Sequence, residues 1–424
     1  MDRLFVTGGT RLEGVVPISG AKNSALKLMA ASLLAEGTST IENVPKIDDC
    51  RTMVEVLEYL GAKVDWDDDG LRIDTTGVDS HEAPYELVSR MRASIIVLGP
   101  LLTRYGRATV AMPGGCNIGS RSIELHLRGL EQMGVEFESE HGYLRATASE
   151  LRGASISLDY PSVGATENVL MAGVGARGTT VIENAAREPE IVDLVEFLVE
   201  MGAKIGGVGT TTIEIEGVEG FTPARHRVVP DRVETGTFAI AAVATQGDVV
   251  LSGGRTDHLD IALSKLSETG AEIRPVDDGF RVVMEGRPKA VDFVTLPYPG
   301  FPTDLQPQMM SMLAVAGGTS IATENVFESR FMFVDELKRM GADIQLEGHH
   351  AVIRGAEKLS SAPVRALDIR AGAAIVIAAL VADGITEITD LHFIDRGYED
   401  LEGKLAGLRA GVRRERDLAA SPAG

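Results

Sequence analysis

The sequence predicts an α/β protein of two domains, built from six repeats of one βαβαββ unit. Three observations predict this fold. Six amphipathic helices each end at a glycine and continue into a short strand, these glycines are 68 to 73 residues apart, and each unit also contains an earlier helix that is almost entirely apolar. Because a helix without a polar face has to be buried, we expect three units to surround one set of buried helices in each domain.

The amphipathic helices set the length of the repeat. They lie in "TMVEVLEYLGAKV", "LHLRGLEQMGVEF", "LVEFLVEMGAKI", "IALSKLSETGAEI", "VDELKRMGADI" and "LEGKLAGLRAGV". The repeating glycines are Gly61, Gly134, Gly202, Gly270, Gly341 and Gly411. A glycine just past a helix favours the left-handed C-cap conformation, which we therefore expect at all six positions.

The apolar helices come earlier in each unit. They are predicted in "NSALKLMAASLLAEG", "RASIIVLGPLLTRYG", "ATENVLMAGVGARG", "TGTFAIAAVATQG", "LQPQMMSMLAVAGG" and "AGAAIVIAALVADG". A β-branched strand such as "RATVAM" or "TTVIENA" follows each helix. Each unit is therefore expected to contain strand, buried helix, strand, amphipathic helix and two further strands.

The first residues have strand character but precede the first complete unit, so we expect them to complete the second domain. The predicted domains are residues 22–229 and residues 1–21 together with 230–424. The chain then crosses between domains twice, near residues 21 and 230. Because two crossings make a hinge, we expect the active site in the interdomain cleft.

Composition excludes several classes of function. The net charge of −21 and the aromatic content of 5% disfavour binding to nucleic acid or to anionic membranes. No apolar run is long enough for a membrane span, and the first residues lack the apolar core of a signal peptide. We expect a cytoplasmic protein in which the two cysteines form no disulfide. The eight histidines show no metal-ligand spacing.

Basic residues recur at the starts of the predicted buried helices. Lys22, Arg92 and Arg370 each lie 14 or 15 residues before the glycine that ends such a helix, and the fifth unit has Asp304 in the same place. The free N–H groups of a helix N-terminus, beside a cation, suit an anion. Asp304 is therefore a candidate catalytic group. For each basic residue taken alone, a structural ion pair is the simpler interpretation.

The stretch "MPGGCNIGSR", residues 112–121, places Cys116 among glycines and beside Arg121. From the residues alone, Cys116 is an inert side chain, a metal ligand or a reactive thiol. A nearby cation and a helix N-terminus would both favour the thiolate.

A set of motifs carries a resemblance to a known family. They are "SGAKNSALK", "MPGGCNIGSR", "SVGATEN", "NAAREPEI", "PDRVETGTF", "FPTDLQPQ", "ENVFESRFM", "LDIRA" and "IDRGYE". Together they resemble the UDP-N-acetylglucosamine 1-carboxyvinyltransferases, a family of enolpyruvyl transferases, over residues 1 to 412. The resemblance implies two inside-out α/β domains with a double crossover hinge. It also implies transfer of enolpyruvyl from phosphoenolpyruvate to the 3′-hydroxyl of UDP-N-acetylglucosamine, with release of phosphate.

The resemblance also implies a biological role. This reaction is the first committed step of peptidoglycan synthesis, and thus serves cell wall biogenesis, cell shape, the cell cycle and cell division. It needs no metal and no cofactor. We expect small-molecule substrates only, and a monomer or a weak homo-oligomer.

The resemblance implies a role for each matching residue. Cys116 would donate a proton, could hold a covalent substrate adduct and would be alkylated by fosfomycin, and Asp304 would be the general base. The residues expected to bind phosphoenolpyruvate are Lys22, Asn23, Arg121, Arg330, Arg370 and Arg396. Those expected to bind the nucleotide sugar are Arg92, Arg121, Ser122, Ile123, Glu124, Leu125, Pro161, Ser162, Val163, Gly164, Asp304 and Val326. Asp368 and Glu188 would support them.

The sequence differs from the family at two places, and three other functions compete with the one that the resemblance implies. Asp48 stands where some relatives have lysine, and Tyr160 with Pro161 stands where some have lysine and valine. An enolpyruvyl transferase that acts on shikimate 3-phosphate lacks the cysteine loop, whereas one that acts on another nucleotide sugar is harder to exclude. RNA 3′-phosphate cyclases use similar repeats, but they need a nucleophilic histidine and would benefit from a basic surface. A pure binding module is the third alternative.

Overall fold

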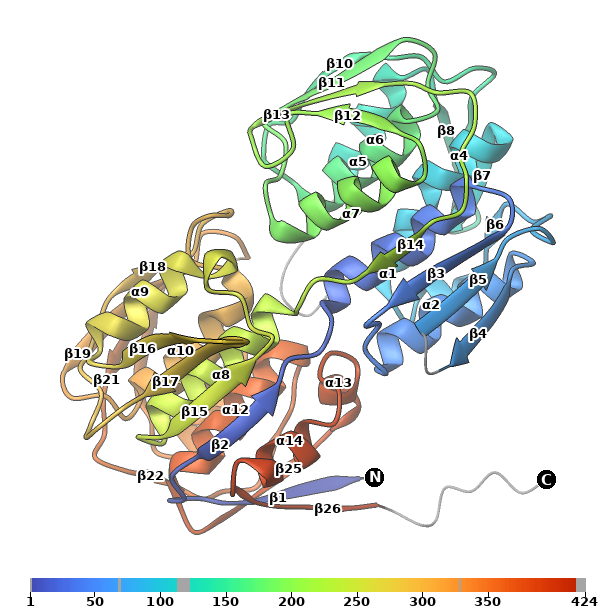
Figure 1. Ribbon diagram of the computed structural model, residues 1–424. Helices are drawn as coiled ribbons and strands as arrows, with labels where there is room; N and C mark the ends of the chain where they lie inside the picture. Colours follow the sequence, from blue (N-terminus) through green and yellow to red (C-terminus); the bar gives the residue numbers. More distant parts are fainter. Residues whose placement is uncertain (1, 68–69, 113–122, 328, 417–424) are drawn as a thin grey trace. The chain divides into compact units, whose positions relative to one another are not determined.

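The computed structural model describes residues 2–67, 70–112, 123–327 and 329–416. The chain folds into two compact units (Figure 1). Within the described residues, the terminal unit contains 2–19 and 230–416, and the middle unit contains 20–112 and 123–229. The predicted interdomain cleft stays a prediction.

The six βαβαββ repeats are confirmed, three in each unit. The first repeat comprises β14 (Arg225–Arg227), α1 (Lys22–Ala31), β3 (Thr38–Glu42), α2 (Asp48–Tyr59), β4 (Lys63–Asp67) and β5 (Gly70–Asp74). The second comprises β6 (Glu82–Ala83), α4 (Leu98–Tyr105), β7 (Arg107–Ala111), α5 (Glu124–Gln132), β8 (Glu136–Glu140) and β9 (Tyr143–Thr147), with the short helix α3 (Tyr85–Val88). The third comprises β10 (Ser155–Ser157), α6 (Val163–Gly173), β11 (Thr179–Glu183), α7 (Pro189–Glu200), β12 (Lys204–Gly206) and β13 (Thr212–Glu216).

The terminal unit repeats this order. The fourth repeat comprises β2 (Glu13–Pro17), α8 (Arg232–Ala244), β15 (Asp248–Ser252), α9 (Asp260–Glu268), β16 (Glu272–Val276) and β17 (Gly279–Val283). The fifth comprises β18 (Phe293–Val294), α10 (Gln306–Leu313), β19 (Thr319–Thr323), α11 (Val334–Arg339), β20 (Asp343–Glu347) and β21 (His350–Arg354). The sixth comprises β23 (Val364–Arg365), α12 (Ile369–Val381), β25 (Ile385–Thr389), α13 (His392–Asp395), α14 (Leu401–Gly407), β26 (Gly411–Glu415) and β1 (Arg3–Thr7), with the small pair β22 (Leu359–Ser360) and β24 (Ala382–Asp383) beside it.

Each repeat forms one four-stranded sheet with the same pairing. The strands before and after the buried helix are parallel, and the last two strands add antiparallel, as in the order β10-β11-β13-β12. A parallel pair needs a crossover connection, and the buried helix supplies it in the second, third, fifth and sixth repeats. The sheet of the first repeat includes β14, which is the last strand of the middle unit in chain order. The N-terminal strands β1 and β2 pair within sheets of the terminal unit (Figure 1).

The core of each unit is its set of apolar helices. In the terminal unit α8, α10 and α12 pack against one another, and in α12 all residues from Arg370 to Leu380 are buried. Many of these residues are alanine or glycine, which lets the helix backbones approach closely. Since the helices have no polar face, the three sheets of the unit have to cover them.

The second apolar helix differs from the prediction. A 3₁₀ helix occupies Arg92–Val97, and the α-helix begins only at Leu98. Pro100 cannot donate the hydrogen bond that an α-helix starting at residue 92 would require of it, but it is tolerated in the first turn of α4. The β-branched run that precedes α4 also disfavours the α-helix.

The C-cap prediction is correct for five repeats and wrong for the sixth. The first five glycines have positive φ, between +88° and +106°. In the sixth repeat Gly411 begins β26, and Arg409 holds the left-handed position with a φ of 70°. The hydrogen bonds explain the error, because Ala410 N bonds to Leu405 O as Ala62 N bonds to Leu57 O in the first repeat. The segment "LRA" of the sixth repeat, residues 408–410, thus corresponds to "LGA" of the first, residues 60–62. Gly411, the glycine that the sequence pattern selected, lies two residues after the true cap position.

Where the chain passes from one unit to the other, hydrogen bonds within each unit join the two chain segments. In the terminal unit Asp231 N donates to Ser19 O at 2.8 Å, and in the middle unit Ala21 N donates to Val229 O at 2.7 Å. In the middle unit a buried histidine also fixes β14, because Nε2 of His226 lies 2.8 Å from Asp193 and Nδ1 lies 3.1 Å from Glu200.

The sixth C-cap gives a stability prediction. Arg409→Gly should raise the free energy of unfolding by about 1 kcal/mol relative to Arg409→Ala, because only glycine adopts positive φ without steric cost. The alanine variant is the matched control, since both substitutions remove the exposed ion pair with Glu13. Urea unfolding monitored by circular dichroism measures the difference. Equal stability of the two variants would contradict the assignment of Arg409 to the cap.

His226 gives a pH prediction. Burial lowers its pKa, but Asp193 and Glu200 outweigh this effect and raise the pKa to about 9. A raised histidine pKa contributes stability that is complete below the unfolded pKa of about 6.5 and is lost as pH rises through the folded value. Stability of the wild type relative to His226→Gln should therefore fall between about pH 6.5 and 9. Thermal unfolding across this range tests it, and a pH-independent difference would refute it.

Candidate active site

In the terminal unit Asp304, the predicted general base, lies between two buried arginines. Asp304 is in a 3₁₀ turn, Thr303–Leu305, directly before α10. Its Oδ1 accepts a hydrogen bond from Nη2 of Arg330 at 2.9 Å, and its Oδ2 accepts from Nε and Nη2 of Arg370 at 3.1 and 2.9 Å. The arginine side chains are 2% and 6% exposed, whereas that of Asp304 is 24% exposed. The carboxylate is therefore the part of this triad that solvent reaches most easily.

The surroundings of the triad fix the arginines. Burial lowers the pKa of Arg370, but Asp304 and other neighbours more than offset this and keep it above its ordinary value. The Arg370 guanidinium also faces the ring of Tyr398, whose hydroxyl contacts Thr237 at 3.0 Å. Among the described residues, Nε of Arg330 is buried without a hydrogen-bond partner. An arginine pair with an unused donor suits an added anion, because meeting a buried unpaired donor gains about 1–3 kcal/mol.

Asp368, which the resemblance gives as a supporting residue, has a local structural role beside Arg370. It is the N-cap of α12, and its Oδ1 accepts hydrogen bonds from the backbone N–H groups of Arg370 at 2.7 Å and Ala371 at 3.0 Å. It thereby holds the turn that carries Arg370.

Glu324 is a residue that sequence reasoning missed. It is 2% exposed, and its carboxylate accepts hydrogen bonds from the hydroxyl of Thr303 at 2.9 Å and from the backbone N–H of Val326 at 2.8 Å. It joins the segment before Asp304 to the predicted nucleotide-sugar residue Val326. Its sequence signals are its place at the start of the motif "ENVFESRFM" and directly after a β-branched strand. Arg396, at the end of α13, is partly exposed.

In the middle unit, Lys22 and Asn23 begin α1. Nζ of Lys22 lies 2.9 Å from Oδ2 of Asp49 at the start of α2, and both side chains are buried. Asn23 is partly exposed beside them. Asp48, one of the departures from the family, is exposed and pairs with Arg51 one helical turn later.

The structure brings together the two stretches predicted to bind the nucleotide sugar. The described part of the first, Ile123, Glu124 and Leu125, begins α5, and the second, Pro161, Ser162, Val163 and Gly164, begins α6. His126 connects them, because its Nδ1 lies 2.8 Å from Nδ2 of Asn168 on α6. A Cβ on Gly164 would be 2.8 Å from the His126 ring, so glycine is required for this approach.

Some predicted residues cannot be placed. Cys116, Arg121 and Ser122 lie outside the described residues. Arg92 begins the 3₁₀ helix before α4, but its side chain is not described. Glu188 is buried at the N-cap position of α7.

Within the described residues, one group has atoms close enough to share a metal ion: Asp193, Glu196 and His226. Both ring nitrogens of His226 already contact carboxylates, as the β14 anchor described above. We therefore interpret this group as an ion-pair cluster. None of its members is a predicted site residue.

No helix in the described ranges is long and apolar enough to cross a membrane.

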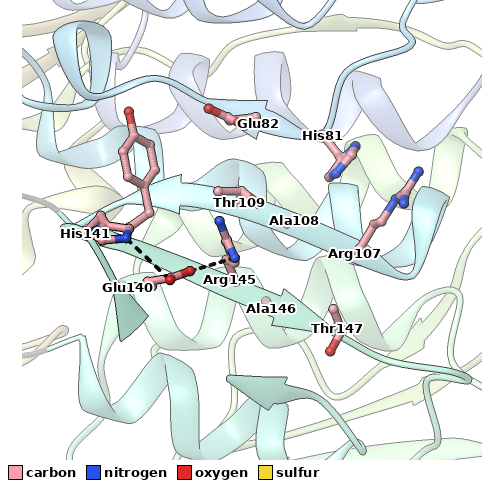
Figure 2. A pocket seen from close by; sticks show the side chains of 11 residues that line it. His81, Glu82, Arg107, Ala108, Thr109, Glu140, His141, Arg145, Ala146 and Thr147 are labelled. Carbon is pink, nitrogen blue, oxygen red and sulfur yellow. Dashed lines mark ion pairs between the residues drawn. The ribbon is translucent and has the colours of Figure 1, made fainter. Parts of the chain in front are cut away.

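A hollow of about 530 Å³ lies on the sheet of β6, β7, β8 and β9 (Figure 2). Its lining includes His81, Arg107 and Thr109, with Glu140 paired to Arg145 at 2.7 Å. No predicted site residue lines it. Most of its charged side chains are exposed on the sheet.

The sequence comparisons both return 1-carboxyvinyltransferases, and the acceptors in their names differ. Residues 6–405 match the family described as EPSP synthase (3-phosphoshikimate 1-carboxyvinyltransferase). The chain is 55% identical to a UDP-N-acetylglucosamine 1-carboxyvinyltransferase of Corynebacterium jeikeium, over 97% of this chain and 99% of the relative. It is 54% identical to the enzyme of that name from Nocardia farcinica, over 97% and 98%.

Solved structures show the same fold. The enolpyruvyl transferase NikO from Streptomyces tendae aligns with a TM-score of 0.88 and 27% identity, over 97% of this chain and 98% of that one. EPSP synthase from Acinetobacter baumannii aligns with a TM-score of 0.74 at 18% identity, over 98% and 100%, which is a likeness of fold alone.

The triad around Asp304 gives a stability prediction. Asp304→Ala should cost about 3 kcal/mol or more, because it leaves two buried guanidinium groups without their shared carboxylate. Asp343→Ala in the same repeat is the matched control, since its pair with Arg354 is exposed and should contribute about 1 kcal/mol or less. Urea unfolding of both variants makes the comparison. Similar losses would contradict the buried triad.

Proposed function

Because this chain belongs to the EPSP synthase family, and within it to the UDP-N-acetylglucosamine 1-carboxyvinyltransferases, we propose that it makes enolpyruvyl-UDP-N-acetylglucosamine. The reaction transfers the enolpyruvyl group of phosphoenolpyruvate to the 3′-hydroxyl of UDP-N-acetylglucosamine and releases phosphate. It commits the nucleotide sugar to peptidoglycan synthesis. The observation that carries the proposal is the Asp304 carboxylate between two buried arginines, in a chain that is 55% identical to an enzyme of this name.

The chemistry requires one base, one acid and several cations. The sugar hydroxyl oxygen bonds to C2 of phosphoenolpyruvate while C3 gains a proton, which gives a tetrahedral intermediate. Loss of phosphate from C2 and of a proton from C3 then restores the double bond. We assign removal of the hydroxyl proton to Asp304, which has to reach the hydroxyl within hydrogen-bond distance, and delivery of the C3 proton to Cys116.

Two groups of cations would hold the substrate anions. Arg330 and Arg370 present planar guanidinium groups, which bind a carboxylate with two parallel hydrogen bonds. The substrate carboxylate would share these arginines with Asp304 and take up the unused Nε of Arg330. Lys22, Arg121 and Arg396 are assigned to the phosphate, with Asn23 beside them.

The nucleotide sugar would lie at the starts of α5 and α6. Residues 123–125 and 161–164 meet there through His126, and partly exposed helix N-termini offer backbone N–H groups to a diphosphate. Arg92, Arg121, Ser122 and Val326 complete this set, and Glu188 supports it. Tyr160 is 41% exposed beside it, so this departure from the family would change contacts to the nucleotide and leave the proposed catalytic groups unchanged.

The proposed enzyme needs no cofactor, since side-chain cations and helix N-termini stabilise the charge that develops on the substrate. We propose that it acts in the cytoplasm as a monomer or a weak homo-oligomer. The second candidate acceptor is shikimate 3-phosphate, which the family description favours. The nucleotide sugar is preferred because 55% identity extends over 97% of this chain, whereas the aligned EPSP synthase is 18% identical.

Phosphate release tests the proposal. Purified protein with phosphoenolpyruvate and UDP-N-acetylglucosamine should release phosphate, and the same protein with shikimate 3-phosphate should not. Asp304→Asn is the matched variant, because it keeps a polar group between the arginines but removes the base, and should release little phosphate. Release with shikimate 3-phosphate only would overturn the assignment of the acceptor. Full activity of the variant would remove Asp304 from its role.

A further inference from the structure

Glu167 is a buried acid without a role in the reaction as proposed. It lies on α6, its side chain has no exposed surface, and neither carboxylate oxygen accepts a hydrogen bond from the described residues. Its charge is met by Lys27, whose Nζ lies 3.3 Å from Oε2. Glu167 and Lys27 thus form an ion pair that links α6 to α1.

Lys27 connects this pair to the predicted phosphoenolpyruvate residues. Its Nζ also donates to the backbone carbonyl of Asn23 at 3.0 Å. Asn23 is in the first turn of α1, next to Lys22. The ion pair is therefore attached to the turn that presents both residues.

Stability alone does not account for such a pair. Removing two charges from water costs several kcal/mol for each ion, and an apolar pair of similar volume is often as stable or more stable. Here the carboxylate also lacks the hydrogen bonds that would offset this cost. A buried pair of this kind is better explained by the geometry that it imposes on its neighbours.

We propose that Glu167, acting through Lys27, is a positioning residue that holds the first turn of α1 so that Lys22 and Asn23 meet phosphoenolpyruvate. The inference rests on the proposed function for the identity of the substrate. The effect on the turn itself does not depend on turnover and can be measured in the free protein.

The charge state of Glu167 should control this effect. Burial raises its pKa to about 7, the pair with Lys27 opposes the rise, and the carboxylates of Glu190 and Glu188 add to it. Below this pH Glu167 is neutral and Lys27 loses its counter-charge. Above it the ion pair is complete, and the first turn of α1 is held.

Glu167→Gln tests the proposal, since it keeps the shape and removes the charge. At about pH 8 the KM for phosphoenolpyruvate should rise about tenfold with a smaller change in kcat. The ratio of kcat/KM between wild type and variant should fall towards one at about pH 6, where the wild type is protonated as well. Titration of phosphoenolpyruvate itself changes kcat/KM of both proteins equally, so this effect cancels in the ratio. An unchanged KM, or a ratio independent of pH, would overturn the inference.

Two further variants separate positioning from stability. The double variant Glu167→Gln with Lys27→Met lacks both charges of this pair, so it should regain stability in urea but keep the high KM. Recovery of KM together with stability would overturn the inference. Glu234→Gln is the matched control in the terminal unit, where a buried glutamate pairs with Lys404 at 2.6 Å. It should leave the KM for phosphoenolpyruvate unchanged.

Hydrogen exchange distinguishes failure of this inference from failure of the proposed function. In substrate-free Glu167→Gln, backbone amides in the first two turns of α1 should exchange faster than in the wild type. Absence of turnover in the wild type would refute the proposed function and leave this measurement valid. Unchanged exchange in a wild type that does turn over would refute the positioning role alone.

Discussion

Burial of six apolar helices is the constraint on which the rest of this structure depends. A helix such as α12, buried from Arg370 to Leu380, cannot lie at a surface, so it needs cover on every side. One four-stranded sheet covers one side only. Three repeats around a common set of helices satisfy the requirement, and the strands borrowed across the chain, β14 in one unit and β1 and β2 in the other, complete the cover.

The same constraint decides where chemistry can occur. Along most of their length the buried helices meet other apolar helices and strands, and polar side chains gather at their N-terminal turns. Lys22 begins α1, Arg370 lies in the first turn of α12, and Asp304 lies in the turn before α10. Charges at these buried positions are costly unless they are paired. Lys22 is accordingly paired with Asp49, and Asp304 with two arginines.

These pairs also explain how one repeat could give rise to different functions. The place at the start of the buried helix recurs in each repeat, although its backbone is α-helical in some repeats and 3₁₀ in others, and the side chain placed there changes from lysine to arginine to aspartate. Under the proposed function, a position that binds an anion in one repeat is the position of the base in another. Asp368 supports Arg370 through a hydrogen bond from its backbone N–H, and Glu324 supports the segment of Asp304 through the hydroxyl of Thr303.

The sequence by itself determined the repeat, the buried helices, the fold class and the family. These properties follow from local patterns: apolar periodicity, glycine after a helix and motifs of adjacent residues. It misplaced the sixth C-cap because Arg409 adopts a conformation that glycine usually occupies, and the hydrogen bonds reveal the equivalence. Only the tertiary structure decided which distant residues meet. Asp304 contacts Arg370 66 residues away, and Glu167 meets Lys27 across two helices, because packing brings side chains together that no local pattern relates.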